Sequence, residues 1–261
     1  MDHWERIHVL VTRPAHQAQS LIVKLSERGA SVLSFPTLSI HPIPLDDATQ
    51  KKLLTLLDMD WIVFISPNAV NHGMPHILPH FDITRFKPQF AAVGEGTADT
   101  LKHFRVKEVL FPENDVGALA LLACFPETLH DKKIFIFKGD SDNQTLENGF
   151  RDKGANVDCC VCYQRIHTQE DPQPLLHALI RKGIDIIVTT SGESLRSLQA
   201  LIPPHMLSDF YQLPLVVVSD HVHELATSLG FKQLYLSKGA SDAAVLDTIA
   251  DWYEHHGGRH E

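Results

Sequence analysis

Two stretches of the sequence, DWIVFIS at 60–66 and DIIVTTS at 185–191, decide the fold because the second nearly repeats the first. They begin 125 positions apart, and the same offset holds without a gap in other parts of the chain. A register shared by apolar runs, helical segments and loops indicates a tandem duplication. The further matches are Gly29-Ala30 with Gly154-Ala155, Val32 with Val157, Gln19 with Gln144, Pro79-His80 with Pro204-His205, and Val93 with Val218.

Short runs rich in Val, Ile and Phe alternate with segments of helical apolar spacing. VLVT precedes QSLIVKLSERG, WIVFIS precedes NAVNHGM, and FAAVG precedes GTADTLKHF. This alternation is typical of βα units that build a parallel sheet. The strand-like runs are almost entirely apolar, as expected where helices cover both faces of a sheet. The sequence therefore predicts an α/β protein.

Two extended segments, 31–44 and 156–168, are too long for single strands of ordinary length. We interpret them as crossings between two lobes. The prediction is two similar flavodoxin-like parallel-sheet lobes joined by a two-stranded β connection. The expected boundaries are 1–34 plus 169–256 for a discontinuous lobe 1, 43–160 for lobe 2, 35–42 and 161–168 for the crossing strands, and 257–261 for a polar tail.

Composition narrows the function classes. The 261 residues are 44% apolar and 21% charged, no run is long enough to form a membrane helix, and the formal net charge is −9. An acidic chain disfavours nucleic-acid binding, which depends on a basic surface. The first residues do not resemble a signal peptide and there are only four cysteines, so we expect a cytoplasmic protein. We expect a monomer because the duplication already supplies two lobes.

Polar residues and glycines follow most of the strand-like runs, and helical segments come next. In open parallel sheets, ligands bind beyond the carboxyl ends of the strands, and helix N-termini there favour anions. A ligand with many carboxylates or phosphates would suit such an edge. The alternative is that these residues are ordinary helix caps and turn residues. The strand ends are Thr12-Arg13, Ser66, Gly94 to Thr97, Lys138-Gly139, Thr190-Ser191, Ser219 and Ser237 to Gly239.

Three of the four cysteines lie close together in VDCCVCY, at 157–163. Along a strand, Cys160 and Cys162 would share one face and Cys159 the other. Neither zinc-ligand spacing nor a C-x-x-C redox motif is present. We expect these cysteines to pack as small apolar side chains, and we expect no metal site.

Common nucleotide and hydrolase motifs are incomplete or missing. VGEGTAD carries Asp99 where a dinucleotide fingerprint has its third glycine, which leaves a nucleotide-binding enzyme as a weak reading. TTSGES at 189–194 is not a nucleophile elbow. Hydrolase chemistry is therefore unsupported.

The order and spacing of several stretches resemble the uroporphyrinogen-III synthase family across nearly the whole chain. The N-terminal T-R-P and the Y-x-R near the second crossing are the most specific of them. The stretches are VLVTRP (9–14), GASVLSFP (29–36), DWIVFISPNAV (60–70), AAVGEGTADTL (91–101), GANVDCCVCYQR (154–165), IIVTTSGESLRSL (186–198) and LVVVS (215–219).

The resemblance implies a cofactor-free lyase that closes hydroxymethylbilane, a linear tetrapyrrole with eight carboxylates, into uroporphyrinogen III. Ring D is inverted and water is lost. It implies that Tyr163 assists departure of the hydroxyl, and that the chain makes transient contact with porphobilinogen deaminase. The implied substrate-binding residues are Thr12, Arg13, Ser66, Thr97, Lys138, Gly139, Thr190, Ser191 and Ser219.

Two features of the sequence depart from this picture. Arg13 could instead pair with an acidic neighbour in its own lobe. Where the family often has R-G-x-G-G-R, this chain reads KGDSDNQ at 138–144, with two added aspartates. From a different class of function, a two-lobed protein that binds a small anion without chemistry is the alternative reading.

Overall fold

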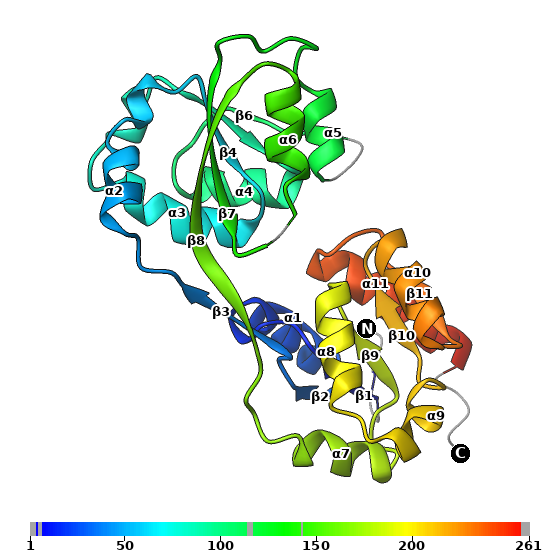
Figure 1. Cartoon of the computed structure of the whole chain (residues 1–261). Coiled ribbons are helices and arrows are strands. Elements are labelled where there is room, and N and C mark those ends of the chain that lie inside the picture. The colour runs from blue at the N-terminus through cyan, green and yellow to red at the C-terminus, as the bar shows by residue number, and fades with distance from the viewer. Residues whose placement is uncertain (1–3, 5–6, 114–116, 142, 257–261) are drawn as a thin grey trace. The chain divides into compact units, whose positions relative to one another are not determined.

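The computed structural model describes residues 4, 7–113, 117–141 and 143–256, and the predicted tail at 257–261 lies outside them. The chain divides into two compact units (Figure 1). Unit 1 comprises Met1–Ser39 and Ile166–Glu261, and unit 2 comprises Ile40–Arg165. None of the helices in the described part of the chain is long and apolar enough to cross a membrane.

Unit 1 is built on a parallel sheet of five strands in the order β11-β10-β9-β1-β2, covered by helices on both faces. The side chains of Val9 and Val11 face α1 and α11, and that of Leu10 faces α8 and α10. The strands are β1 (His8–Val11), β2 (Ser31–Ser34), β9 (Ile186–Val188), β10 (Leu215–Val217) and β11 (Leu234–Leu236). The helices are α1 (Ala15–Glu27), α7 (Gln173–Ile180), α8 (Gly192–Ala200), the 3₁₀ turn η3 (Pro204–Met206), α9 (Leu207–Phe210), α10 (Asp220–Leu229) and α11 (Asp242–His256).

Unit 2 has a sheet of six strands in the order β3-β8-β7-β4-β5-β6. One face packs against α3 and α4, and the other against α5 and α6. The strands are β3 (Leu38–Pro42), β4 (Trp61–Phe64), β5 (Gln89–Ala92), β6 (Val109–Leu110), β7 (Lys133–Gly139) and β8 (Asn156–His167). The helices are α2 (Asp47–Leu53), η1 (Leu56–Asp58), α3 (Pro67–Ile77), η2 (Ile83–Arg85), α4 (Glu95–His103), α5 (Ala118–Ala123) and α6 (Thr145–Asp152).

The five strands of the unit 1 sheet repeat in unit 2 at the predicted offset of 125 residues, and β3 is an additional strand of the unit 2 sheet. Val9 pairs with Ile186 in unit 1, and the residues equivalent to them, Ile134 and Trp61, pair in unit 2. The same correspondence holds for β1 with β2, β9 with β10 and β10 with β11. The order β2-β1-β9-β10-β11 is the flavodoxin-like one, which confirms the predicted fold class.

The chain passes between the units along β3 and β8, which run antiparallel. The amide of Ile43 donates to the carbonyl of Cys162 at 3.1 Å, and the amide of Thr168 donates to the carbonyl of Thr37 at 3.0 Å. The passage points, between residues 39 and 40 and between residues 165 and 166, lie within the two extended segments that the sequence marks as crossings.

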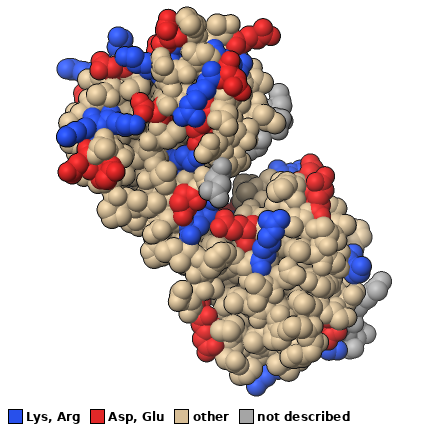
Figure 2. Space-filling model, in the orientation of Figure 1, with Lys and Arg blue, Asp and Glu red and all other residues tan. Residues whose placement is uncertain are grey.

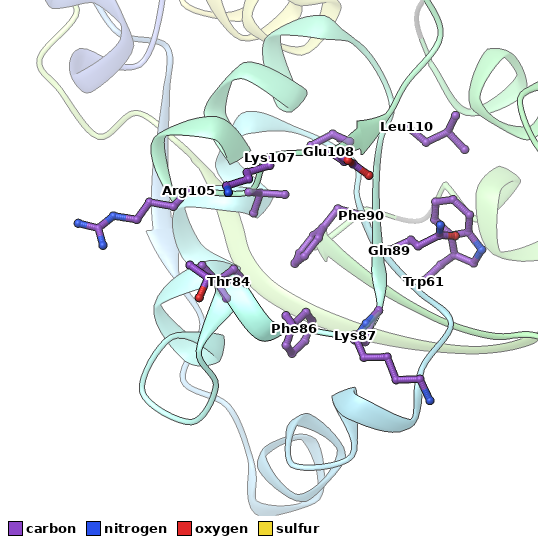
Figure 3. Close-up of a pocket in the computed structure, with 14 residues that line it drawn as sticks. Trp61, Thr84, Phe86, Lys87, Gln89, Phe90, Arg105, Lys107, Glu108 and Leu110 are labelled. Carbon is purple, nitrogen blue, oxygen red and sulfur yellow. The ribbon is translucent and has the colours of Figure 1, made fainter.

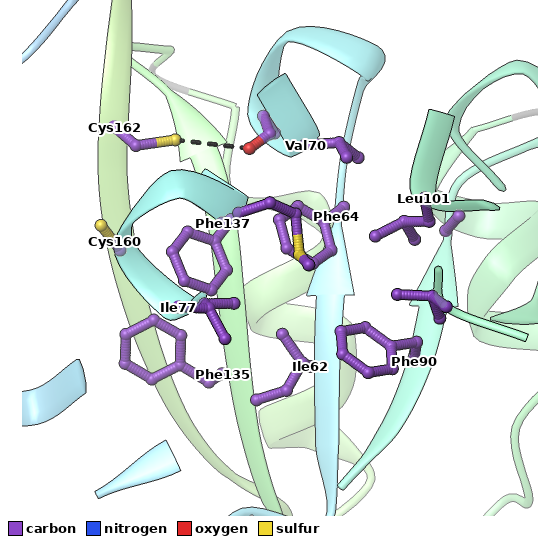
Figure 4. Packing of buried hydrophobic residues seen from close by; sticks show 14 of the residues in the cluster. Ile62, Phe64, Val70, Ile77, Phe90, Leu101, Phe135, Phe137, Cys160 and Cys162 are labelled. Atoms are coloured by element: carbon purple, nitrogen blue, oxygen red, sulfur yellow. Dashed lines mark hydrogen bonds between the residues drawn. The ribbon is translucent and has the colours of Figure 1, made fainter. Parts of the chain in front are cut away.

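Aromatic packing fills the core on one face of the unit 2 sheet (Figure 4). The ring of Phe64 stacks on that of Phe137 with centroids 4.9 Å apart and an interplanar angle of 6°. Helix α3 can approach these rings because residue 73 is glycine, where a Cβ atom would lie 2.6 Å from Phe137 Cδ1. The glycine of α3 and the aromatic residues of β4 and β7 therefore pack closely against one another.

We predict that Phe64→Ala lowers the free energy of unfolding by about 3–5 kcal/mol, because it removes buried area and leaves a cavity between Phe90 and Phe137. The measurement is urea unfolding followed by circular dichroism. The matched control is Leu119→Ala, at a side chain that is 73% exposed, for which the change should stay within about 0.5 kcal/mol. Equal losses in the two variants would contradict the packing described.

Candidate functional site

Three of the predicted site residues lie together at the carboxyl edge of the unit 2 sheet: Ser66 after β4, Gly139 at the end of β7, and Tyr163 in β8. The oxygen atoms Ser66 Oγ and Tyr163 Oη are 3.0 Å apart, within hydrogen-bond distance. Ser66 also caps α3, since its Oγ accepts a hydrogen bond from the amide of Ala69 at 3.0 Å. Tyr163 is completely buried, and Ser66 is half-buried.

A β-bulge turns the side chain of Tyr163 inward. Lys138 pairs with Val161, but the next residue of β7, Gly139, pairs with Tyr163, so one residue of β8 is passed over. Strict alternation would place Tyr163 on the face opposite Cys162, yet both side chains are buried in the same core cluster. Bulges are found where a strand must re-aim a side chain beside an active site.

Gly139 makes room for the phenol ring. A Cβ atom at this position would lie 2.5 Å from Tyr163 Cζ and 2.9 Å from the hydroxyl oxygen. Any larger residue would therefore displace the ring. The contact of Gly139 with Tyr163 gives this predicted substrate-binding residue a part in placing the hydroxyl group.

Two residues that the sequence analysis did not select complete the surroundings of Tyr163. Arg165 Nη2 lies 3.3 Å from Tyr163 Oη, and its guanidinium lies 5.7 Å from the centre of the phenol ring. The ring of His72, on α3, stacks on the same phenol with centroids 5.8 Å apart. The position of Arg165, two residues beyond Tyr163 in the same strand, could have predicted that it lies near Tyr163. No such pattern points to His72, which reaches Tyr163 through the packing of α3.

Lys138 is a buried cation that already has partners. Its ammonium group forms a short hydrogen-bonded ion pair with the carboxylate of Glu147, in the first turn of α6, and donates to the carbonyl of Asn143 at 3.1 Å. Both side chains of the ion pair are less than one-tenth exposed. Binding a substrate carboxylate through Lys138 would require this pair to break.

Arg13 occupies the equivalent position in unit 1, 125 residues before Lys138. Its guanidinium binds the carboxylate of Asp242 at 2.7 Å and the carbonyl of Ala240 at 2.9 Å. Burial acts to raise the pKa of Asp242, but hydrogen bonds from Ser20, Arg13 and Lys24 outweigh burial and lower it. The structure thus bears out the pairing of Arg13 with an acidic neighbour of its own lobe.

Most of the hydroxyl groups predicted for the site form hydrogen bonds with nearby backbone groups. Ser191 caps α8 through the amide of Ser194, and Ser219 caps α10. Thr12 is buried and donates to the carbonyl of Val188 at 3.0 Å. Thr97 lies buried in the first turn of α4, and Thr190 is half-buried beside Ser191. In each unit these residues follow the carboxyl ends of parallel strands, where exposed amide groups of helix N-termini are also found.

The three cysteines of the stretch 157–163 pack as predicted. Cys160 and Cys162 belong to the core cluster of one face of the sheet (Figure 4), and Cys159 packs against that of the other face. Burial is the main cause that raises the pKa of the Cys159 thiol to about 11 and those of Cys160 and Cys162 to about 12. Neutral thiols are poor nucleophiles and poor metal ligands, so these residues serve as core side chains.

A cavity of about 510 Å³ lies elsewhere in unit 2 (Figure 3). Its walls include Trp61, Gln89 and Val109, which are the first residues of β4, β5 and β6. It is therefore at the amino edge of the sheet, opposite the strand ends that carry Ser66 and Gly139. On the face drawn in Figure 2, basic and acidic side chains are interspersed in both units, so no broad basic surface is seen there.

A sequence model described as "Uroporphyrinogen-III synthase HemD" matches residues 19–247, which include most of both units. The chain belongs to the uroporphyrinogen-III synthase family. It is 25% identical over 243 residues to the uroporphyrinogen-III synthase of Escherichia coli K12, which covers 92% of this chain and 99% of that protein. The enzyme of the same name from Salmonella typhimurium is 26% identical over 244 residues, with the same shares covered.

Solved structures of the uroporphyrinogen-III synthase family have the same fold. A mutant synthase from Thermus thermophilus superimposes with a TM-score of 0.67 at 15% identity, covering 96% of this chain and 100% of that one. The uroporphyrinogen-III synthetase of Helicobacter pylori 26695 gives 0.59 at 14% identity, covering 94% and 99%. At these identities the likeness is one of fold.

For Gly139→Ala we expect a loss of about 1–3 kcal/mol in the free energy of unfolding, because the added methyl group overlaps the buried ring of Tyr163. The control is Gly96→Ala in α4, where no atom lies within 4 Å of the added carbon, and which should be neutral or slightly stabilising. Chemical denaturation of the two variants gives the comparison. A neutral Gly139→Ala would show that the ring can move aside freely.

For Lys138→Met we expect a loss of about 3–5 kcal/mol, because the carboxylate of Glu147 is left buried without its partner. Adding Glu147→Leu should restore most of this loss, since the unpaired charge is then gone. Lys102→Met, which breaks the exposed pair with Asp99, should change stability by less than about 1 kcal/mol. If the double variant is no more stable than Lys138→Met, the ion pair is not the reason for the loss.

Proposed function

We propose that this chain converts hydroxymethylbilane into uroporphyrinogen III, closing the linear tetrapyrrole with inversion of ring D and loss of water. The observation that carries this proposal is the family match across both units, from residue 19 to residue 247. The polar residues at the carboxyl edges of both sheets support it, because a substrate with eight carboxylates needs many hydrogen-bond donors. Such an enzyme acts in tetrapyrrole and haem biosynthesis.

The donors available to the substrate are mainly hydroxyl groups and backbone amides. Ser66, Ser191 and Ser219 each lie at the N-terminus of a helix that follows a strand. Amides at such termini, together with the helix dipole, bind carboxylates without a cationic side chain. We propose that these three serines, with Thr97 and Thr190, mark the substrate-binding surfaces of the two units.

The chemistry needs little acid strength. The pyrrole nitrogen can expel the hydroxyl group from the hydroxymethyl carbon, which leaves an azafulvene cation. A weak acid such as the phenol of Tyr163 is then sufficient as the proton source. The main contribution of the protein is positioning, which favours closure through a spiro intermediate over simple head-to-tail closure. This route needs no cofactor.

We further propose that the chain works in the cytoplasm as a monomer and receives its substrate from porphobilinogen deaminase in transient contact. Hydroxymethylbilane left in solution would otherwise close without inversion. The alternative of a two-lobed protein that binds a small anion without chemistry is not favoured by the family match.

The test is a coupled assay from porphobilinogen with porphobilinogen deaminase. Addition of the chain should shift the oxidised product from the type I to the type III isomer, and a folded protein that leaves only type I would overturn the proposal. Tyr163→Phe should lower kcat roughly ten- to hundredfold, at the low end of general acid catalysis. A wild-type rate in that variant would remove the role of Tyr163 and leave the synthase activity standing.

A further inference from the structure

The hydrogen bond between Ser66 Oγ and Tyr163 Oη allows one residue to protonate the substrate and the other to replace that proton. We infer that Ser66 Oγ delivers the proton to the departing hydroxyl group of the substrate, and that Tyr163 replaces the proton on Ser66. The inference rests on the proposed function and names the residue that touches the reacting oxygen. Ser66 is then a catalytic residue, and Tyr163 acts through it.

Burial separates the two hydroxyl groups. Tyr163 has no exposed surface in the described structure, and its Oη lies between Ser66 Oγ at 3.0 Å and Arg165 Nη2 at 3.3 Å. Ser66 is half-buried at the end of β4, where a ligand of the carboxyl edge would approach. Ser66 therefore has surface that a substrate hydroxyl group can approach, whereas Tyr163 has none.

The hydrogen-bond donors and acceptors allow protons to pass in one direction, from Tyr163 to Ser66. A guanidinium group only donates, so Tyr163 Oη accepts from Arg165 and its own proton is free to point at Ser66 Oγ. Ser66 Oγ also accepts from the amide of Ala69 at 3.0 Å. With both lone pairs of Ser66 engaged in this way, its own proton is directed outward, toward the edge where the substrate would lie.

Atoms and electrons balance in this step. The bond between the hydroxymethyl carbon and its oxygen breaks, and both electrons leave with the oxygen, while the pyrrole nitrogen supplies electrons to the carbon. The oxygen takes the proton of Ser66 and departs as water, and Ser66 takes the proton of Tyr163. The resulting phenolate faces the guanidinium of Arg165, which stabilises it. The proton lost from carbon when the macrocycle closes returns through Ser66 to the phenolate.

Unit 1 shows that a serine can cap the equivalent helix without a hydrogen bond to a tyrosine. Ser191 is the counterpart of Ser66 and caps α8 through the amide of Ser194 at 3.1 Å. Its Oγ lies 3.0 Å from the hydroxyl of Ser194, and the counterpart of Tyr163 is the buried Leu38. Only the copy in unit 2 links the capping serine to a phenol and a guanidinium among these equivalent positions.

Substitutions of Ser66 in the whole chain distinguish its role as the cap of α3 from its role in proton transfer. Ser66→Thr keeps both a capping oxygen and a transferable proton, and its kcat for type III formation should stay within about threefold of wild type. Ser66→Asn keeps the cap, because asparagine caps helices as well as serine does, but its amide does not transfer a proton. We expect kcat to fall to about the level of Tyr163→Phe, with little change in KM and in the urea midpoint.

The control variant is Asp46→Asn, which changes the capping residue of α2 away from the site and should leave kcat unchanged. Combining Ser66→Asn with Tyr163→Phe should cost no more than either change alone, because residues that act as one unit are not additive. A wild-type kcat in Ser66→Asn, or losses that multiply in the double variant, would overturn the inference. The wild-type assay for type III product tests the proposed function by itself, so the two failures are distinguishable.

Discussion

The pairing of β7 with β8 is the constraint on which the rest of unit 2 depends. Phe135 and Phe137 of β7 fill the core beneath α3, and β8 leaves the same ladder to become part of the connection to unit 1. The single irregularity in this ladder, at Gly139, decides that Tyr163 is buried beside Ser66. Core packing, the connection between units and the placement of the phenol are therefore consequences of one strand pairing.

The duplication supplies two copies of each strand end, and the copies have been used differently. Arg13 and Lys138 are equivalent buried cations, and each is neutralised by a carboxylate in the first turn of a different helix, Asp242 of α11 and Glu147 of α6. A buried charge is tolerated only with such a partner. Since the partners come from non-equivalent positions, the two units neutralise equivalent buried cations in different ways.

The sequence predicted the features that depend on periodicity. It did not predict the features that depend on a one-residue bulge or on contacts between distant parts of the chain. The repeat at 125 residues predicted two similar sheets, and the alternation of Cys159 to Cys162 predicted their opposite faces. The bulge that reverses the direction of Tyr163 leaves no periodic signal, because it is one extra residue in one strand. The partners of Arg13 and Lys138, and the approach of His72, depend on the tertiary packing of helices.

The neutralisation of the two buried cations has a consequence for the reaction itself. Loss of the hydroxyl group creates positive charge on a pyrrole, and a like charge about 4 Å away would oppose it by about 4 kcal/mol at an effective dielectric constant of about 20. A site crowded with free lysine and arginine would bind eight carboxylates well but would destabilise the cation that follows. Hydroxyl groups and helix amides, as proposed for this chain, would bind the carboxylates without that penalty. Arg165, placed beside the hydroxyl of Tyr163, puts its charge where the proposed proton transfer would create a negative one.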